Sequence, residues 1–462
     1  MTPAPHSDEP LSGEAETSRS PILPAHPGGG FGQRSASSRE PLPLILQSAS
    51  LLFANAETTE RTLSAGNRVA EALGYRATVI PRWDELTVRL EGSAGAQHDV
   101  EQVAPAGIDM NKVLATEQTI DAMSDGRLQP EDARLAFAKI AALPPVSLGR
   151  FALAAAVGAS ALSVIFGAMH PPSIALIALS AGAGAVIRRG LSHVSPNLLL
   201  QPFCAALLAG LVGGIAQRYQ LSSPQALVAL CPCMVLVPGP HFLNGLLDLA
   251  HARVSLGFAR IAFALLVIVA ISAGLLLGLW LVGATLPLAP SSRSVALAVD
   301  VVAAGLAVSA YGSFYSMPWR YLPLPILVGM VAHGIHWWVL SMGASAYAAT
   351  FVACLFVGLV VTPLANRLRL PFAAMAFAAV VSLIPGVFLF RMAAGVVQMA
   401  RLGVNAPSSL ARAVLAEGLT AILILLAMGF GLIAPKLWAE HSRPARSSST
   451  IAKEGTGHVR KA

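Results

Sequence analysis

The sequence predicts an α-helical polytopic membrane protein with about ten transmembrane helices, arranged as two inverted five-helix repeats, and a small cytosolic α/β N-terminal domain. The first observation is composition: 55% of the 462 residues are hydrophobic and 12% are charged, whereas soluble domains carry about 25% charged residues. The second is the distribution of acids: residues 1–150 hold 19 of the 24, and only three lie between Phe151 and Pro435. The third is a Pro-Gly pair that recurs in the fourth span of each half.

The two ends of the chain and its first domain differ in composition from the apolar middle. Residues 1–40 are rich in Pro, Ser, Gly and Glu, which predicts a disordered tail. Residues 437–462 are predicted to be a disordered, basic tail. Between them, residues 41–145 alternate helical and strand periods and predict the α/β domain. Its expected elements are a helix at 41–73 ended by Gly74, strands in RATVIP, LTVRLEG and QHDVEQV, and helices at 111–123 and 130–143.

The apolar middle divides into segments of membrane-crossing length, for which about 20 apolar residues are needed. The first five-span half is expected at 146–285 and the second at 286–436. Several spans are short, and the fourth ends at a Pro-Gly-Pro sequence. The ten spans are predicted at 150–169, 173–188, 198–217, 225–238, 258–284, 294–316, 322–341, 346–364, 371–390 and 411–434.

Basic residues beside the spans indicate the orientation. With the α/β domain in the cytoplasm, Arg and Lys favour the inner side by about two to one, in line with the positive-inside rule. Residues 1–30 contain no apolar core long enough for a signal peptide, so the first span is expected to direct insertion. The prediction is a multi-pass protein of the bacterial inner (cell) membrane with both termini cytoplasmic. The net charge of +7 is attributed to this orientation and not to nucleic-acid binding.

A short repeat underlies the prediction of two halves. CMVLVPGPHFLNGLLDL and VVSLIPGVFLFRMAAGV both place a Pro-Gly pair after an apolar run, at Pro238-Gly239 and Pro385-Gly386. Because each half has five spans, the second enters the membrane upside down, as in inverted-repeat transporters, whose broken helices line the substrate site. A break leaves backbone groups unpaired, which costs several kcal/mol per group in lipid unless a cavity supplies partners. The alternative is that both pairs are loop turns at span ends.

Polar residues beyond the two Pro-Gly pairs are candidate substrate ligands. Asn244 and Asp248 are four residues apart and therefore share a helix face that could hold an ammonium or hydroxyl group. The alternative is the polar face of a helix start in a cytoplasmic loop. Arg391, at the same offset as Asn244, suits a carboxylate. Its alternative is snorkelling to the outer interface.

Acids at membrane depth are candidates for proton coupling. Asp300 lies in the sixth predicted span, where an unpaired acid is expensive and therefore suggests a function. The alternative is an ion pair with an Arg that joins two spans. Glu417 is a second candidate. Its alternative is a position in a wet rim, with a salt bridge to Arg412 or to an Arg of another loop.

The His pair in HGIHWW, His333 and His336, is compatible with a proton relay or a metal pair. Two His residues are too few for zinc, and Trp337 and Trp338 favour an interfacial aromatic belt instead. No metal or cofactor is expected.

The stretch VPGPHFLNGLLDLAHARVSLGFARI resembles the signature of the threonine/serine exporter family, in its fused two-half form. LLFANAETTERTLSAGNRVAEALGY resembles the family's N-terminal helix, and YGSFYSMPWRYLPLPILVGMVAHGIHW with RLRLPFAAMAFAAVVSLIPG resembles its second half. The likeness runs from about residue 43 to 434. One departure, Pro240-His241-Phe242-Leu243 between Pro-Gly and Asn, leaves the substrate open. The signature residues are Pro238, Gly239, Asn244, Asp248, Gly257 and Arg260.

The resemblance implies a secondary active exporter of threonine, serine or a similar small amino acid, with proton coupling expected and the lipid bilayer as its surroundings. Export of a dicarboxylate such as succinate is the alternative, because related split forms are associated with it. A homo-oligomer is left open. An enzymatic or sensory N-terminal domain is a third hypothesis, but we find no nucleophile–base motif there. The sequence also lacks GxxxxGK[ST], so neither an enzyme nor an ATP-driven pump is predicted.

Overall fold

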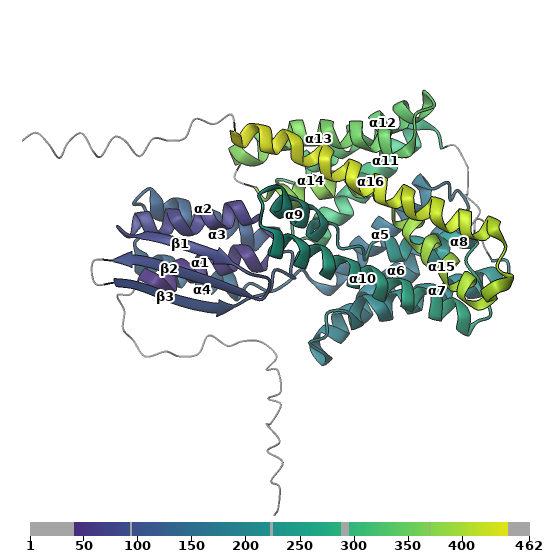
Figure 1. Ribbon diagram of the computed structural model, residues 1–462, viewed down its shortest axis with the longest axis horizontal. Helices are drawn as coiled ribbons and strands as arrows, with labels where there is room; N and C mark the ends of the chain where they lie inside the picture. Colours follow the sequence, from purple (N-terminus) through teal and green to yellow (C-terminus); the bar gives the residue numbers. More distant parts are fainter. Residues whose placement is uncertain (1–40, 93–94, 222–224, 288–294, 369, 442–462) are drawn as a thin grey trace, which may run out of the picture. The chain divides into compact units, whose positions relative to one another are not determined.

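The computed structural model describes residues 41–92, 95–221, 225–287, 295–368 and 370–441 (Figure 1). The predicted N-terminal tail, and the predicted C-terminal tail beyond His441, lie outside the described residues. The described part consists of an α/β region and a larger set of apolar helices.

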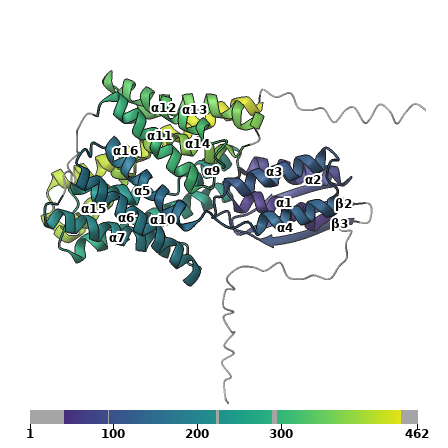
Figure 2. The same cartoon turned by 180° about the vertical axis from the view of Figure 1, so that it is seen from behind.

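The α/β region contains one three-stranded antiparallel sheet in the order β1-β2-β3. Leu86, Val88 and Leu90 alternate along the middle strand and are buried, so they share the face on which the helices pack. Figures 1 and 2 show the helices on one face of this sheet. The predicted strands and the last two helices are confirmed. The elements are α1 (Pro41–Ala54), α2 (Thr59–Ala72), β1 (Arg76–Pro81), β2 (Glu85–Gly92), β3 (Gly95–Gln102), α3 (Met110–Ser124) and α4 (Pro130–Ala141).

The single helix predicted at 41–73 is wrong, because the chain breaks between α1 and α2. Ala56 has a φ of 62°, which a helix does not allow. The Asn55 side-chain amide donates to the Leu51 carbonyl at 2.8 Å and caps the end of α1. No Pro or Gly marks this turn, so the sequence pattern did not reveal it. Gly74, with a φ of 80°, ends α2 as predicted.

The described apolar helices include nine that are long enough to cross a membrane, or up to ten if a bent pair counts as one span. The bent pair is α8 and α9, which meet at an angle of 53°. The helices are α5 (Leu148–Ile165), α6 (Pro171–Val194), α7 (Leu200–Arg218), α8 (Gln225–Met234), α9 (Gly239–Ala250), α10 (Val254–Leu281), α11 (Leu297–Phe314), α12 (Pro323–Ser341), α13 (Ala346–Leu368), α14 (Phe372–Val380), α15 (Gly386–Leu402) and α16 (Ser408–His441).

Both Pro-Gly pairs interrupt helical segments, and this changes two predicted spans. The fourth, expected to end at residue 238, continues beyond the break as α9. The ninth, expected at 371–390, is two pieces. The first is α14 with a short 3₁₀ turn, and the second is α15, which is long enough to span together with the 3₁₀ turn that extends it to Asn405. Proline has no N–H, and it disfavours helical backbone at the residue before it, so each segment breaks there. Helix α16 also continues to His441, five residues into the predicted tail.

The helices from α5 to α10 pack among themselves as those from α11 to α16 do. Helix α10 lies along α7 as α16 lies along α13, and α9 contacts α10 as α15 contacts α16. Between the sets, α5 packs on α11, while α8 contacts α15 and α9 contacts α14. The contacts within the first set of described helices therefore correspond pairwise to those within the second.

Glycines permit the close approach in both long helix pairs. A Cβ on Gly274 of α10 would lie 2.2 Å from the Phe203 carbonyl oxygen of α7. A Cβ on Gly431 of α16 would lie 2.8 Å from the Cβ of Cys354 in α13. Small residues let helices approach closely in lipid, where packing drives association.

Candidate functional site

The two helix breaks lie against each other. Helix α9 begins at Gly239, and a Cβ there would lie 1.5 Å from the ring of Phe377 in α14. Helix α15 begins at Gly386, and a Cβ there would lie 3.0 Å from Met234 Cγ at the end of α8. Each Pro-Gly pair therefore abuts the helix that precedes the other break.

The first break is closed by protein groups. The Tyr311 hydroxyl, from α11, donates to the Met234 carbonyl at 3.1 Å, which satisfies an acceptor at the end of α8. The Gly239 amide bonds to the Val237 carbonyl at 3.0 Å. Two cavities adjoin this break, of about 10 and 30 Å³, and both are too small for an amino acid.

The second break is open to a cavity of about 460 Å³. Leu383 and Ile384 of the break line it, together with side chains from α11, α12 and α13. Its buried hydroxyl groups come from Ser382 and Thr350, which are 4% and 1% exposed, while the exposed Ser341 also lines it. The Ser382 oxygen has no hydrogen-bond partner, so the cavity offers an unsatisfied polar atom beside the start of α15.

An acid–histidine pair forms part of the cavity wall. Asp300 Oδ2 of α11 lies 2.9 Å from His333 Nδ1 of α12, and both residues are buried. The ring of His336 lies 5.7 Å from that of His333, centroid to centroid, and also faces the cavity. Three titratable side chains therefore follow one another along this wall.

This pair changes two predictions about these helices. Asp300 pairs with a histidine and not with the Arg that its alternative reading required. His333 is 3% exposed, so it is not part of an interfacial belt, whereas Trp338 is 57% exposed and suits one. The sequence signal for this acid–histidine pair was an acid in one predicted span and two His residues at i and i+3 in the next.

Asn244 and Asp248 lie on the buried face of α9 that contacts the α/β region. The Asn244 amide donates to the Ala56 carbonyl at 3.0 Å. Asp248 Oδ2 lies 2.9 Å from Arg260 Nε of α10, and Arg260 is 0% exposed. Their surroundings are thus the turn between α1 and α2 and the start of α10. They do not line the cavity of the second break.

Arg391 and Glu417 pair with each other across α15 and α16. Arg391 Nη1 lies 3.9 Å from Glu417 Oε1, and Arg391 is 4% exposed. Glu417 therefore has Arg391 and not Arg412 as its partner in the structure. Neither residue lines the cavity, so Asp300 is the one predicted substrate ligand or coupling acid found there, beside His333 and His336.

The two buried hydroxyl residues of the cavity were not singled out by sequence reasoning. Ser382 lies three residues before Pro385, inside the repeated stretch. Its nearness to the Pro-Gly pair is a sequence signal that could have identified it. Thr350 is a single hydroxyl in the apolar helix α13. Its sequence surroundings give no signal, because only the packing of α13 against the break brings it to the site.

Broken helices that meet beside a buried cavity, among described residues with nine to ten candidate spans, are the arrangement by which many polytopic membrane transporters build a substrate site. Residues 43–282 match the ThrE family model, described as "Putative threonine/serine exporter". Residues 300–438 match the ThrE_2 model, described as "Threonine/Serine exporter, ThrE". The chain belongs to the threonine/serine exporter family and carries both parts in one polypeptide, as the resemblance implied. No solved structure matches the chain.

Proposed function

We propose that the protein exports threonine, serine or a similar small polar amino acid through the cavity of the second break, driven by the proton gradient. The observation that supports this most strongly is the buried Asp300–His333 pair at 2.9 Å beside that break. A buried acid is costly without a partner, so a pair that faces a cavity is suited to exchange a proton with it.

The chemistry of the cavity walls suits a zwitterion with a hydroxyl group. The N-terminus of α15 carries the positive end of a helix dipole and receives the substrate carboxylate. Asp300 receives the ammonium group, while Thr350 and Ser382 bond to the hydroxyl. The carboxylate of Asp300 binds either the ammonium group of the substrate or a proton, so substrate and proton cannot be bound there at the same time. That exclusion is what antiport of protons and amino acid requires.

The two helix sets provide the two gates in this proposal. With five spans in each set, the second set is inverted in the membrane, and the α/β region and both termini face the cytoplasm. The break at Pro238-Gly239 is closed in this structure, whereas that at Pro385-Gly386 is open to the cavity. Asn244, Asp248 and Arg391 are buried away from it. They contact substrate only if the opposite conformation exposes them.

A dicarboxylate is the alternative cargo, and the cavity disfavours it. No Lys or Arg occurs among the described residues that line the cavity, whereas Asp300 does. A substrate with two carboxylates would therefore face an acid without a compensating cation.

Counterflow in proteoliposomes tests the substrate. Vesicles loaded with threonine should take up labelled threonine, serine should compete, and succinate should not. Thr350→Val and Ser382→Ala should each lower the affinity about tenfold, as expected for the loss of a hydrogen bond worth about 1.4 kcal/mol. Ser309→Ala is the control, because this exposed α11 hydroxyl bonds within its own helix. Succinate counterflow that depends on Arg391 would overturn the assignment.

A further inference from the structure

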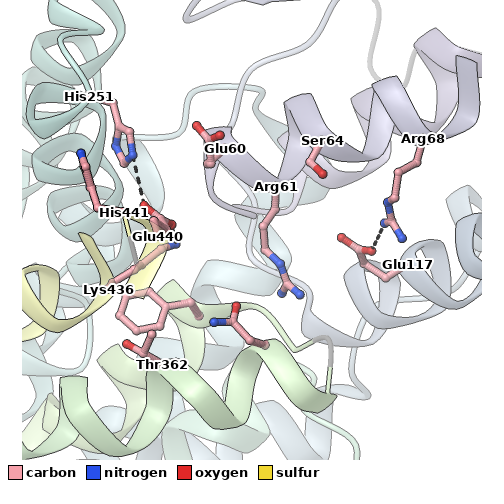
Figure 3. Close-up of a pocket in the computed structure, with 12 residues that line it drawn as sticks. Glu60, Arg61, Ser64, Arg68, Glu117, His251, Thr362, Lys436, Glu440 and His441 are labelled. Atoms are coloured by element: carbon pink, nitrogen blue, oxygen red, sulfur yellow. Dashed lines mark hydrogen bonds and ion pairs between the residues drawn. The ribbon is translucent and has the colours of Figure 1, made fainter. Parts of the chain in front are cut away.

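A second cavity lies at the junction of the α/β region with α13 and α16 (Figure 3), and the transport proposal does not use it. Its volume is about 560 Å³, within the range of about 300–1,000 Å³ for small-molecule sites. The wall comes from α2 and α3 of the α/β region, from the end of α9, and from α13, α14 and α16.

Both signs of charge line this cavity, in equal number. The acids are Glu60, Glu117 and Glu440, and the bases are Arg61, Arg68 and Lys436. Figure 3 shows the α2 and α16 side chains directed into the same space. A simple anion or cation would meet like charges here, whereas a molecule with both charges can match both sets.

Two of the cations are available to a ligand and one is not. Arg68 is held by Glu117 at 2.6 Å and by Asp121 at 2.5 Å. Lys436 is 6% exposed, and its nearest acid, Glu440, is 3.5 Å away. Arg61 donates to the carbonyl of Leu370 and lies 3.8 Å from Glu57, a separation that leaves donors for a carboxylate.

The acids also differ in their availability. Burial raises the pKa of the Glu117 carboxyl, against the opposing effect of Arg61 and Arg68, and Arg68 already occupies this carboxylate at 2.6 Å. Glu440 is shared between Lys436 and His251 at 3.5 and 3.3 Å. It therefore lies beside the Lys436 ammonium group and the His251 ring, and it also lines the cavity.

A buried hydroxyl supplies independent evidence that a ligand belongs here. Thr362 of α13 lines the cavity, is 3% exposed, and its Oγ1 has no hydrogen-bond partner. A buried polar atom without a partner costs about 1–3 kcal/mol, and a ligand oxygen or amine would remove that cost.

We propose that this cavity binds a free α-amino acid as a zwitterion, at a site separate from the transport cavity. The carboxylate lies between Lys436 and Arg61, the ammonium group meets Glu440, and Thr362 bonds to the ligand. Because the walls come from the α/β region and from α13 and α16, an occupied site ties that region to the second helix set. The proposal stands on these charges and not on which substrate crosses the membrane.

The test is a titration of the purified full-length protein in detergent with L-threonine, followed by isothermal calorimetry. Two binding events per chain are expected. Thr362→Val should abolish or weaken one event at least tenfold and leave the other unchanged, while Thr350→Val should affect only the other. Since the Thr362 hydroxyl is unpartnered, its removal should leave the unliganded protein as stable as before, or slightly more stable.

Charge variants and probe ligands test whether the ligand of this cavity is a zwitterion. Lys436→Met should weaken the Thr362-dependent event at least tenfold, whereas the control Lys139→Met, an exposed lysine of α4, should not. Ethanolamine and succinate, which each carry one sign of charge, should not displace threonine from this site. A single event that responds only to Thr350→Val, or displacement by succinate, would overturn the proposal. An absence of transport with a Thr362-dependent event intact would count against the exporter proposal alone.

Discussion

At the scale of single residues, three charged pairs of the helix set each join residues of two different helices. Asp248 pairs with Arg260, Asp300 with His333, and Arg391 with Glu417. The sequence identified the acids, because an acid in an apolar span is conspicuous. It could not identify the partner, since His333 lies 33 residues from Asp300 and many arginines were available to Glu417. Only helix packing selects among them.

Loss of Asp248 should destabilise the protein strongly. Asp248→Ala leaves the fully buried Arg260 without its acid, and breaking a buried pair on one side costs about 3–5 kcal/mol. The double variant Asp248→Ala/Arg260→Leu should recover much of this loss, because no buried charge remains unpaired. Thermal unfolding in detergent measures both. Asp125→Ala, which removes an exposed acid paired with Arg127, is the control and should change little; an equal loss in both single variants would contradict the account.

At the scale of elements, the sequence predicts regular pieces well and interruptions poorly. Alternating residues such as Leu86, Val88 and Leu90 reveal a strand directly. The turn after α1 was missed, since Asn55 and Ala56 continue an apolar stretch without Pro or Gly. The Pro-Gly pairs were recognised, but the length of α15 was not predicted. A Pro-Gly pair that breaks a helical segment in the middle looks the same in the sequence as one that ends the segment.

Glycine at the first break should be irreplaceable. In Gly239→Ala, the new Cβ would lie 1.5 Å from the Phe377 ring, so α9 and α14 must separate. We expect a lower yield of folded protein, a lower melting temperature and the loss of threonine counterflow. Replacement of the ring in Gly239→Ala/Phe377→Leu should restore part of each. Gly149→Ala is the matched control, because nothing lies within 4 Å of a Cβ there; equal effects at both glycines would refute the role of close packing.

At the scale of the whole molecule, repeated packing with unequal cavities is the main feature of the helix set. The first break is sealed by Tyr311, and the second opens to about 460 Å³. The five spans predicted for each half, on which the proposed inversion depends, stay a prediction, but the Pro-Gly repeat was visible in the sequence. The difference between the cavities was not, because it arises from side chains of α11, α12 and α13 that meet only in the fold.

Proton-driven accumulation of threonine in proteoliposomes tests the central claim most directly, with Asp300→Asn compared against wild type and Ser309→Ala. With a pH gradient imposed, wild type and the control should concentrate threonine, and the internal pH should change in step. Asp300→Asn should lose this accumulation while retaining threonine–threonine exchange, since an amide can hold the ligand but cannot carry the coupling proton. Undiminished accumulation by Asp300→Asn would contradict the account.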